Sequence, residues 1–500
     1  MTAVFGDLAS NIVLGFGVAL TFENLLYCAI GVTIGTIAGV IPGLGSMATM
    51  SMLLPLTFHL APTPALIMLG GLYYGTTYGG STAAILLNIP GTPATAVTCL
   101  DGFPMAQKGR AGVALFMTTI ASFFGASIGI TLMLLFAPMI AGTALQFGPA
   151  EYFSLMVMGL LAASTLSTGS PMKGVAMVGL GILFGLAGID VTSGATRFTF
   201  GILELLDGVS LVVLAMGIFG LAQVVVGNSD MPTARYRKFK LRDMLPSRDE
   251  MGRSWMPMLR GSGLGSFFGI LPGVGPTVAS FMSYAIEKRL ADDPSRFGNG
   301  AIEGIMGPES TNNAAEQTAF IPTMTLGVPG SASMALILGV LIMNGIAPGP
   351  SLITQSPDLF WGLVMSFWIG NIMLLVLNIP FIGLWVRLLT IPYRVLFPAI
   401  IVFICIGTFS LNNNTFDILM VMAFGAFGYL MRLLAFPAAP FLLGFVLGPM
   451  MEEHFRRAMV LSQGDFTTFV TRPISLSFVL LTVLIVLGGI AARLRMRLAD

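Results

Sequence analysis

Charged side chains are scarce in this chain of 500 residues. Lysine and arginine number 24, aspartate and glutamate number 23, and together they make up 9% of the sequence. A soluble globular domain carries about 25%. Because 55% of the residues are hydrophobic, most of the surface must face lipid. The composition therefore excludes a soluble enzyme, a nucleic-acid-binding protein and a disordered scaffold.

Cysteine and histidine are also rare. Cys28, Cys99 and Cys405 lie in apolar segments without the spacing of metal ligands, so we interpret them as small packing residues and not as a disulfide framework. Two histidines cannot form a histidine-rich metal site, and we expect no structural metal. No lysine or arginine precedes Lys108. The N-terminus thus lacks the basic region of a secretory signal, and we expect it to be retained.

Long uncharged runs occupy most of the chain. Residues 24–100 contain no charged side chain, and shorter runs of the same kind continue to residue 492. A helix that crosses the hydrocarbon core needs about 20 residues, so these runs predict roughly 10 to 14 spanning or half-spanning helices. They are continuously apolar and not alternating, which argues against a β-barrel. We predict an all-α polytopic membrane protein, and its 61 glycines and 29 prolines indicate broken or closely packed helices.

One basic segment interrupts the apolar pattern near the middle of the chain. Residues 228–260 hold eight lysines and arginines against four acids, which places them in the cytoplasm by the positive-inside rule, together with the basic C-terminal tail. The predicted organisation is a first repeat at 1–227, a basic cytoplasmic linker at 228–257, a second repeat at 258–492 and a basic cytoplasmic tail at 493–500.

Two internal patterns recur in order and indicate a duplication. The first half contains Gly31-x3-Gly35-x3-Gly39-x2-Pro42-Gly43-x-Gly45, and every residue of that pattern recurs 230 positions later, from Gly261 to Gly275. Further along, Ile89-Pro90-Gly91-Thr92 is echoed by Val328-Pro329-Gly330-Ser331. Chance is a poor explanation for motifs that recur in the same order in both halves, so we infer an internal repeat.

The Pro-Gly-x-Gly ends of the first pattern predict helix breaks at corresponding places in both halves. Such paired breaks are typical of secondary transporters, because unwound backbone at membrane depth must line a wet cavity or lie buried in protein. Its free carbonyl groups can coordinate a cation. The Gly-x3-Gly rows before the breaks are more simply explained by close helix packing. The residues predicted to bind cations are Pro42, Gly43, Gly45, Pro272, Gly273, Gly275 and Thr277.

The second pair of segments is richer in hydroxyl and amide groups. These groups stand beside predicted helix breaks, which suits recognition of a carboxylate by hydrogen bonds in re-entrant hairpins. The alternative is an extramembrane turn with ordinary Ser and Asn capping. The residues predicted to bind substrate are Ser81, Thr82, Asn88, Pro90, Gly91, Thr92, Asn312, Asn313, Pro329, Gly330 and Ser331.

Two acids flank the Asn312-Asn313 pair. Glu309 and Glu316 are candidates for proton or cation binding if their segment lies in the membrane, and they are merely solvated if it is a loop. Asp190 and Arg197 are more simply explained as an ion pair that stabilises a loop (a loop staple) than as a functional site. Neither glycine pattern continues into the Lys-Ser or Lys-Thr of a nucleotide-binding loop, so the sequence does not support transport driven by ATP.

The repeated glycine-proline pattern, together with four further motifs, resembles a known family over roughly residues 8 to 492. It is similar to the large membrane (permease) subunit of the tripartite tricarboxylate transporter family, TctA type. The further motifs are Tyr78-Gly79-Gly80-Ser81-Thr82, Asn88-Ile89-Pro90-Gly91, Arg197-Phe198-Thr199-Phe200-Gly201 and Pro308-Glu309-Ser310-x-Asn312-Asn313-Ala314.

The resemblance implies a multi-pass protein of the bacterial inner membrane that imports carboxylates by an ion gradient, with Na⁺ or H⁺ as coupling ion and no other cofactor. It implies two partner proteins: a periplasmic solute-binding protein that delivers the substrate and a small membrane subunit. It further implies two inverted structural repeats with discontinuous helices, paired re-entrant hairpins and an elevator-type motion. Membrane lipid and a homo-oligomer remain open as further partners, whereas a net charge of +1 predicts no nucleic acid.

The sequence thus predicts an ion-coupled symporter of a citrate-like di- or tricarboxylate and not an enzyme. Neither Pro-Gly-x-Gly segment nor the run 317–357 contains a lysine or arginine, so an anionic substrate must be balanced by helix N-termini, amides and bound cations. A membrane-embedded enzyme needs clustered acids with a metal or a histidine base, and a passive channel remains the other alternative. We expect alanine at Asn88 or Asn313 to abolish uptake.

Overall fold

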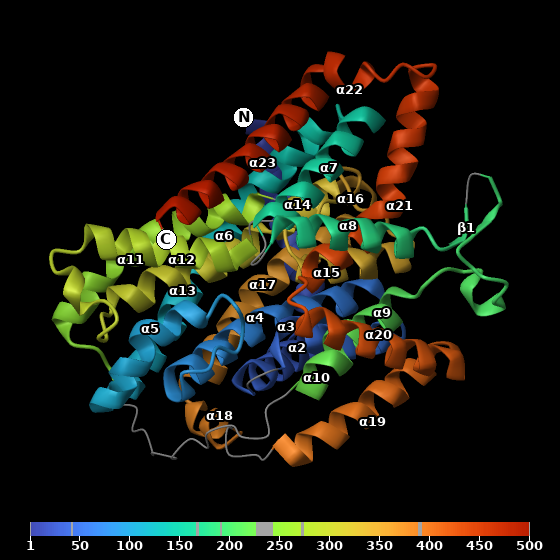
Figure 1. Ribbon diagram of the computed structural model, residues 1–500. Coiled ribbons are helices and arrows are strands. Elements are labelled where there is room, and N and C mark those ends of the chain that lie inside the picture. Colours follow the sequence, from blue (N-terminus) through green and yellow to red (C-terminus); the bar gives the residue numbers. More distant parts are fainter. Residues whose placement is uncertain are drawn as a thin grey trace.

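A computed structural model gives the architecture. It describes residues 2–41, 44–166, 170–190, 193–226, 244–271, 275–388 and 393–499. The chain is built almost entirely from helices (Figure 1), and the one strand pair in the described ranges is the short hairpin β1–β2. An all-α membrane protein was predicted, and this part of the prediction is confirmed.

The first half of the chain begins with helices of very different lengths. The elements are α1 (Thr2–Ala19), α2 (Phe22–Val40), α3 (Gly45–Thr57), α4 (Pro62–Leu87), α5 (Ala96–Met105), η1 (Ala106–Arg110), α6 (Ala111–Ala144), α7 (Pro149–Leu166), α8 (Pro171–Gly185), β1 (Gly188–Ile189), β2 (Thr196–Arg197), η2 (Leu203–Leu205), α9 (Leu211–Ala215), η3 (Met216–Leu221) and α10 (Ala222–Val226).

The second half starts after the basic segment. Its elements are α11 (Arg248–Ile270), α12 (Gly275–Leu290), η5 (Pro294–Arg296), α13 (Glu303–Thr318), α14 (Phe320–Leu326), α15 (Ala332–Met343), α16 (Leu352–Gln355), α17 (Pro357–Asn378), α18 (Ile382–Leu388), α19 (Tyr393–Asn412), α20 (Thr415–Leu433), α21 (Ala438–Leu461), α22 (Thr468–Thr471) and α23 (Pro473–Ala499).

Four helical segments of the described chain are long and apolar enough to cross a membrane, which supports a multi-pass membrane protein. They are Phe22–Val40, Ala96–Ala144, Pro357–Asn378 and Thr415–Leu433. Other apolar helices are shorter, such as Pro171–Gly185 and Ala332–Met343. The expected 10 to 14 segments included half-spanning ones, and the described chain has six such shorter apolar helices beside the four long ones.

The two Gly-x3-Gly rows pack helices against each other, as the simpler interpretation predicted. A methyl group at Gly35 of α2 would lie 2.3 Å from the Leu72 carbonyl oxygen of α4, and one at Gly265 of α11 would lie 2.1 Å from the Thr311 carbonyl oxygen of α13. Only glycine allows backbones to approach so closely. Thr311 lies 239 residues after Leu72, so the two helix pairs cross at corresponding positions.

The breaks of the two halves also have matching conformations. Ile41 and Leu271 follow their helices in extended conformation, and Gly45 and Gly275 start the next helices with φ of +59° and +68°. Four residues of these breaks, Pro42, Gly43, Pro272 and Gly273, lie outside the described residues. Since a positive φ is costly for residues with a Cβ, glycine at these two starts has a local backbone reason.

The second pair of breaks matches as well. Asn88 ends α4 with φ 57° and ψ 31°, and Gly327, 239 residues later, ends α14 with φ 69° and ψ 21°. The segment around Glu309 and Asn313 is the buried helix α13 and not a solvated loop. The loop interpretation of these two acids is therefore wrong.

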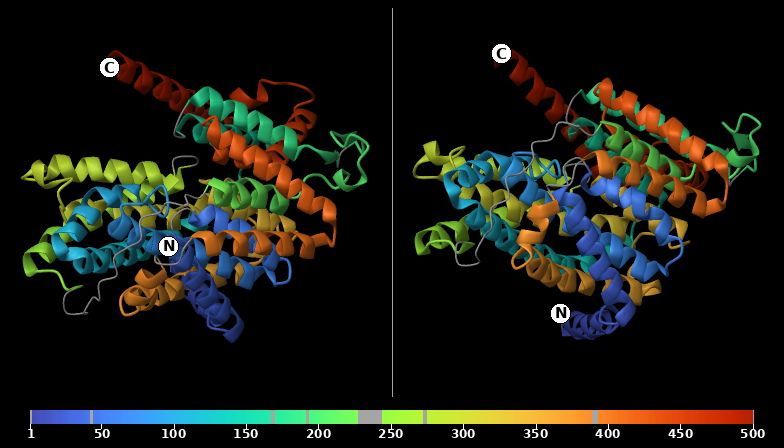
Figure 2. Two further views of the ribbon diagram at one scale, coloured as in Figure 1. Left: turned by 60° about the horizontal axis from the view of Figure 1, so that its bottom comes forward. Right: turned by 90° about the horizontal axis from the view of Figure 1, so that it is seen from below.

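The remaining helices surround this pair of broken segments. In Figure 1 the helices α5, α11, α12 and α13 lie together on one side, and α7, α8, α21 and α23 form a group above the central α3, α4 and α15. Figure 2 shows the α1 and α23 ends at opposite extremes of the molecule. The β1–β2 hairpin projects outward, and Arg197 Nη2 contacts Asp190 Oδ2 at 2.5 Å, the loop staple that the simpler interpretation predicted.

Candidate functional site

A cavity of about 690 Å³ lies at the centre of the broken segments. Its walls come from α3, α4, α7, η3, α10, α12, α13, α15, α20 and α21 and from the loops before α5, α15 and α21. The cavity therefore joins both halves of the chain.

The residues that follow the first pair of breaks border this cavity together. Ser46 and Met47 contribute from the start of α3, and Gly275, Pro276 and Thr277 contribute from the start of α12. The chain thus brings two segments that are 230 residues apart in sequence to one space. Because α3 and α12 both begin at the wall, their N-terminal ends lie at the cavity, where the partial positive charge of a helix favours an anion.

The residues that follow the second pair of breaks complete the wall. Thr92 and its neighbours line it from the loop before α5, and Gly330 to Ser333 line it from the start of α15. Ser46 Oγ lies 3.5 Å from Ser333 Oγ, so the two kinds of break are in contact across the halves. Ser331 caps α15 by accepting a hydrogen bond from the backbone N–H of Met334 at 3.3 Å.

The residues predicted to bind substrate or cation fall into three groups. Five described ones line the cavity: Thr92, Gly275, Thr277, Gly330 and Ser331. Gly45 and Gly91 adjoin its wall residues, and Pro329 is buried next to Gly330. The others lie elsewhere in the described chain: Ser81, Thr82, Asn312 and Asn313 are buried within α4 and α13, whereas Asn88 and Pro90 are exposed. Pro42, Gly43, Pro272 and Gly273 lie outside the described residues.

A polar seam connects α4 of the first half to α13 of the second. Tyr74 Oη donates to Gln317 Oε1 at 2.6 Å, Thr77 Oγ1 donates to Glu316 Oε1 at 2.7 Å, and Ser81 Oγ donates to Glu309 Oε1 at 2.8 Å. Partner numbers fall along α13 as they rise along α4, so the two helices run antiparallel along the seam. Buried polar groups need such partners, and here side chains of one half provide partners for side chains of the other.

Glu309 is surrounded by hydroxyl donors. Ser81 and Thr98 donate to its Oε1, and Ser122 donates to Oε2 at 3.2 Å. The three donors come from α4, α5 and α6, so this carboxyl group joins three helices of the first half to α13. Both of its oxygens are occupied.

Glu316 has a different environment. It is 4% exposed and borders the cavity. Thr77 donates to Oε1, but Oε2 is buried without a hydrogen-bond partner among the described residues. One turn earlier, both side-chain polar atoms of Asn312 are likewise unpartnered within that part of the chain. Unsatisfied buried polar atoms are uncommon in native proteins, and these lie next to the cavity wall.

Several wall residues escaped the sequence reasoning. Tyr73 is on α4, and Gln223 and Arg432 stand at the ends of α10 and α20. Arg432 Nη1 donates to Gln223 Oε1 at 2.6 Å, so an exposed positive charge stands at the cavity rim. Arg432 is the only basic residue between 395 and 455 in the sequence, and this isolation was a usable signal.

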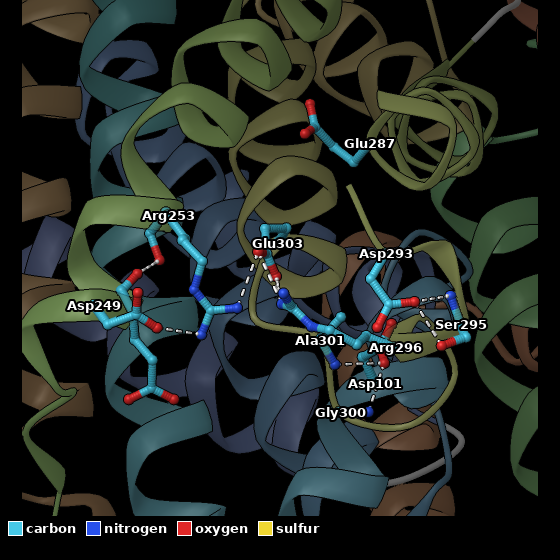
Figure 3. A network of polar contacts seen from close by, with 12 residues as sticks. Asp101, Asp249, Arg253, Glu287, Asp293, Ser295, Arg296, Gly300, Ala301 and Glu303 are labelled. Atoms are coloured by element: carbon cyan, nitrogen blue, oxygen red, sulfur yellow. Dashed lines mark hydrogen bonds and ion pairs between the residues drawn. The ribbon is translucent and has the colours of Figure 1, made fainter. Parts of the chain in front are cut away.

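A second cluster anchors the halves to each other away from the cavity. Asp101 of α5 accepts hydrogen bonds at Oδ1 from the backbone N–H groups of Gly298, Gly300 and Ala301 at 2.7–2.9 Å. Its Oδ2 accepts from Tyr284 Oη at 2.9 Å. Figure 3 shows Asp101 among these backbone groups, beside an ion network of Asp249, Arg253, Glu303 and Arg296. We name the Asp101 contacts the clasp, because they attach α5 to the loop before α13.

The described residues contain no cluster of three or more histidine, cysteine or acidic side chains that would hold a metal ion. Apolar helices of membrane-spanning length, helix breaks in both halves and a cavity that both halves line define the class: a multi-pass membrane protein with broken helices around a central cavity. Residues 25–443 match the tripartite tricarboxylate transporter TctA family. The chain belongs to this family, whose members are the large subunits of tripartite tricarboxylate transporters.

Two relatives come from Agrobacterium vitis. An uncharacterized 52.8 kDa protein in the TAR-I ttuC' 3' region is 50% identical over 471 residues, which cover 94% of each chain. An uncharacterized protein in the TAR-II ttuC' 3' region is 57% identical over 213 residues, which cover 43% of this chain and 88% of the relative. No solved structure matches the chain.

Proposed function

We propose that the chain is the permease of an ion-gradient-driven importer of a di- or tricarboxylate, such as citrate, in the bacterial inner membrane. A periplasmic solute-binding protein delivers the substrate, and a small membrane subunit completes the complex. Membership of the TctA family supports a tripartite transporter subunit. The observation that carries the proposal further is the single cavity bordered by the segments after all four breaks.

The cavity suits an anion with several carboxylates. Four helices, α3, α5, α12 and α15, begin at or within a few residues of its wall, and their N-terminal ends carry free N–H groups and partial positive charge. Hydroxyl groups of Ser46 and Thr92 add donors. Arg432 at the rim supplies the one full positive charge among the described wall residues. These features favour a carboxylate over a neutral or cationic solute.

The proposal includes two inverted repeats that move by an elevator mechanism. Matching offsets pair Gly45 with Gly275 and Asn88 with Gly327, and by the second offset of 239 residues Thr77 corresponds to Glu316. Thr77 contacts Glu316 directly at 2.7 Å. A residue that touches its own counterpart lies on the axis that relates two repeats, and the antiparallel seam fits a two-fold axis in the membrane plane.

Import of such an anion requires co-transported cations. Moving one charge against 100 mV costs about 2.3 kcal/mol, so a trianion entering a negative interior costs about 7 kcal/mol and about three cations offset it. We place Na⁺ or H⁺ sites near Gly45, Gly275 and Thr277, together with Pro42, Gly43, Pro272 and Gly273. An uncoupled channel cannot accumulate substrate against this potential, which separates it from a symporter.

The test is uptake by the complete complex in proteoliposomes. The binding protein is first screened with citrate, malate and succinate, and its bound ligand is then supplied in radiolabelled form. We expect accumulation only with an inward Na⁺ or H⁺ gradient. Substitution of Thr277 by Val is expected to reduce uptake at least tenfold, whereas Ser295→Ala in an exposed loop should have no effect. Equal uptake with and without both gradients contradicts the proposal.

A further inference from the structure

We infer that Glu316 binds one of the coupling cations, taking up its single positive charge at the free oxygen Oε2. The inference rests on the proposed function and deepens it by assigning a residue. Glu316 is not part of the glycine-proline segments at which the sequence places cation sites, and it lies in the last turn of the buried helix α13.

The first argument is the incomplete coordination of this carboxyl group. Oε1 receives a hydrogen bond from Thr77, but Oε2 has no partner in the described residues, although it is fully buried. An ionised carboxylate that is buried without a compensating charge is costly. A bound cation, either H⁺ or Na⁺, removes that cost, and the adjoining cavity provides the route by which it arrives.

The second argument is the comparison with Glu309, two turns away on the same helix. Glu309 has hydroxyl donors on both oxygens, so its hydrogen-bonding capacity is already used for structure. Glu316, which lines the cavity, has one donor and one oxygen without a partner among the described residues. The same residue type on the same helix thus occurs once in a closed environment and once in an open one.

The third argument is the absence of another counter-charge near Glu316 in the described chain. The ionisable side chains of α4 that face it are Tyr73, Tyr74 and Tyr78, which are neutral at physiological pH. Charged residues of other elements that contact α13 include Asp101 at Gly304, Glu287, which pairs with Arg260, at Gly307, and Arg253 at Glu303. These lie nine or more residues before Glu316, about 14 Å along a helix. Arg432 is exposed at the rim and bonded to Gln223.

Its position gives Glu316 a role in coupling. The carboxyl group lies on the seam between the two halves and at the wall of the cavity. A cation held there is close to an anionic substrate in the cavity, and attraction between the two is strong where water is largely excluded. Substrate and cation therefore stabilise each other's binding, which is the requirement for symport.

The experiment measures how many charges cross with each substrate. The intact complex is reconstituted with radiolabelled ligand of its binding protein, and the membrane potential at which net flux stops is determined at a fixed substrate ratio. Glu316→Gln is expected to transport with one positive charge fewer per substrate. At 100 mV this lowers the limiting accumulation ratio about 50-fold. Glu316→Asp, which keeps the carboxyl group, and Glu309→Gln should keep the wild-type charge ratio.

Two arms identify the cation. One arm uses a pH gradient without Na⁺, and the other uses a Na⁺ gradient at uniform pH. The cation that Glu316 binds is the one in whose gradient the charge transported per substrate differs between Glu316→Gln and wild type. An unchanged charge ratio in Glu316→Gln overturns the assignment while the proposed function stands. A wild-type complex without gradient-driven accumulation contradicts the proposed function itself, and the assignment with it.

A labelling experiment on the wild-type protein tests the assignment even if the Glu316 variants fail to fold. Dicyclohexylcarbodiimide reacts with carboxyl groups in apolar surroundings, and mass spectrometry locates the adduct within residues 303–318. We expect labelling at Glu316 that falls at least fivefold when Na⁺ or substrate is added. Labelling at Glu309 instead, or labelling of Glu316 that neither addition changes, overturns the assignment.

Discussion

At the residue scale, the functional side chains differ from ordinary buried polar residues by what they leave unsatisfied. Most buried hydroxyls of α4 and α13 donate to a carbonyl one turn earlier or to a partner helix, as Thr311 and Ser81 do. Such groups stabilise the fold and have no capacity left for a ligand. Glu316, which lines the cavity, and Asn312, one turn earlier on α13, keep polar atoms without a partner among the described residues. This distinction requires coordinates, because the sequence shows both kinds as polar residues in an apolar run.

Asn88 allows a direct test of the prediction, made from the sequence, that its side chain binds substrate. It is exposed and ends α4 in the left-handed conformation, where its counterpart is Gly327. If Asn is needed at position 88 only because it adopts the left-handed conformation readily, Asn88→Gly should retain uptake within about twofold, whereas Asn88→Val should destabilise the protein by about 1–2 kcal/mol. Thermal unfolding in detergent and vesicle uptake measure the two effects.

The opposite pattern would identify a binding role for the Asn88 side chain. In that case Asn88→Gly would lose uptake as completely as Asn88→Ala while both variants unfold at the wild-type temperature. Gly327→Ala serves as the matched control, because it introduces strain at the corresponding position without removing a polar group.

At the element scale, the glycine rows determine how the helices cross. Gly265→Ala should destabilise the protein by about 1–3 kcal/mol or more, because the added methyl group would lie 2.1 Å from the Thr311 carbonyl oxygen. Gly263 is the control on the same helix: an added methyl group meets no atom within 4 Å, and alanine there should stabilise α11 by about 0.5–1 kcal/mol. Thermal unfolding of both purified variants is the measurement, and equal stabilities would contradict the packing interpretation.

Sequence reasoning succeeded best for these elements. A glycine row is a local pattern with one strong physical cause, so Gly31, Gly35 and Gly39 predicted a close helix contact that the structure contains. Sequence reasoning was weaker for the helix around Glu309. Its polar residues were compatible with a helix or a loop, and only their burial in the structure shows that the segment is the helix α13. It did not find Arg432 or Gln223, because their place at the cavity depends on how α10 and α20 fold back across the chain.

The clasp yields a prediction about the assembly of elements. Asp101→Ala leaves the N–H groups of Gly298, Gly300 and Ala301 without their acceptor, which should cost at least about 1–3 kcal/mol. Limited proteolysis in residues 291–302 and the unfolding temperature report the change. Asp249→Ala removes an exposed pair with Arg253 and should cost less than about 1 kcal/mol. If Asp249→Ala lowers the stability of the protein as much as Asp101→Ala does, the clasp stabilises the fold no more than an exposed ion pair.

At the scale of the whole molecule, the two halves build one cavity, and neither half encloses it alone. The duplication of the two halves stays a prediction. The sequence did predict the helix ends at corresponding positions of the two halves, because glycine and proline at these positions are visible in the sequence. It did not predict which polar groups meet across the halves. Tyr74 and Gln317, or Ser46 and Ser333, become neighbours only when the halves pack.

Alternating access to the cavity separates a transporter from a passive channel. Cys28, Cys99 and Cys405 are first replaced by alanine, and Ser333, buried at the cavity wall, is replaced by cysteine. A membrane-impermeant thiol reagent should label Cys at position 333 from only one side of oriented vesicles at a time, and an imposed ion gradient with substrate should change that side. Substrate should also slow labelling at least fivefold by occupying the cavity, while cysteine at the exposed Ser295 reacts at a constant rate. A channel leaves position 333 reactive from both sides at once, because a continuous pore has no state in which one entrance is closed.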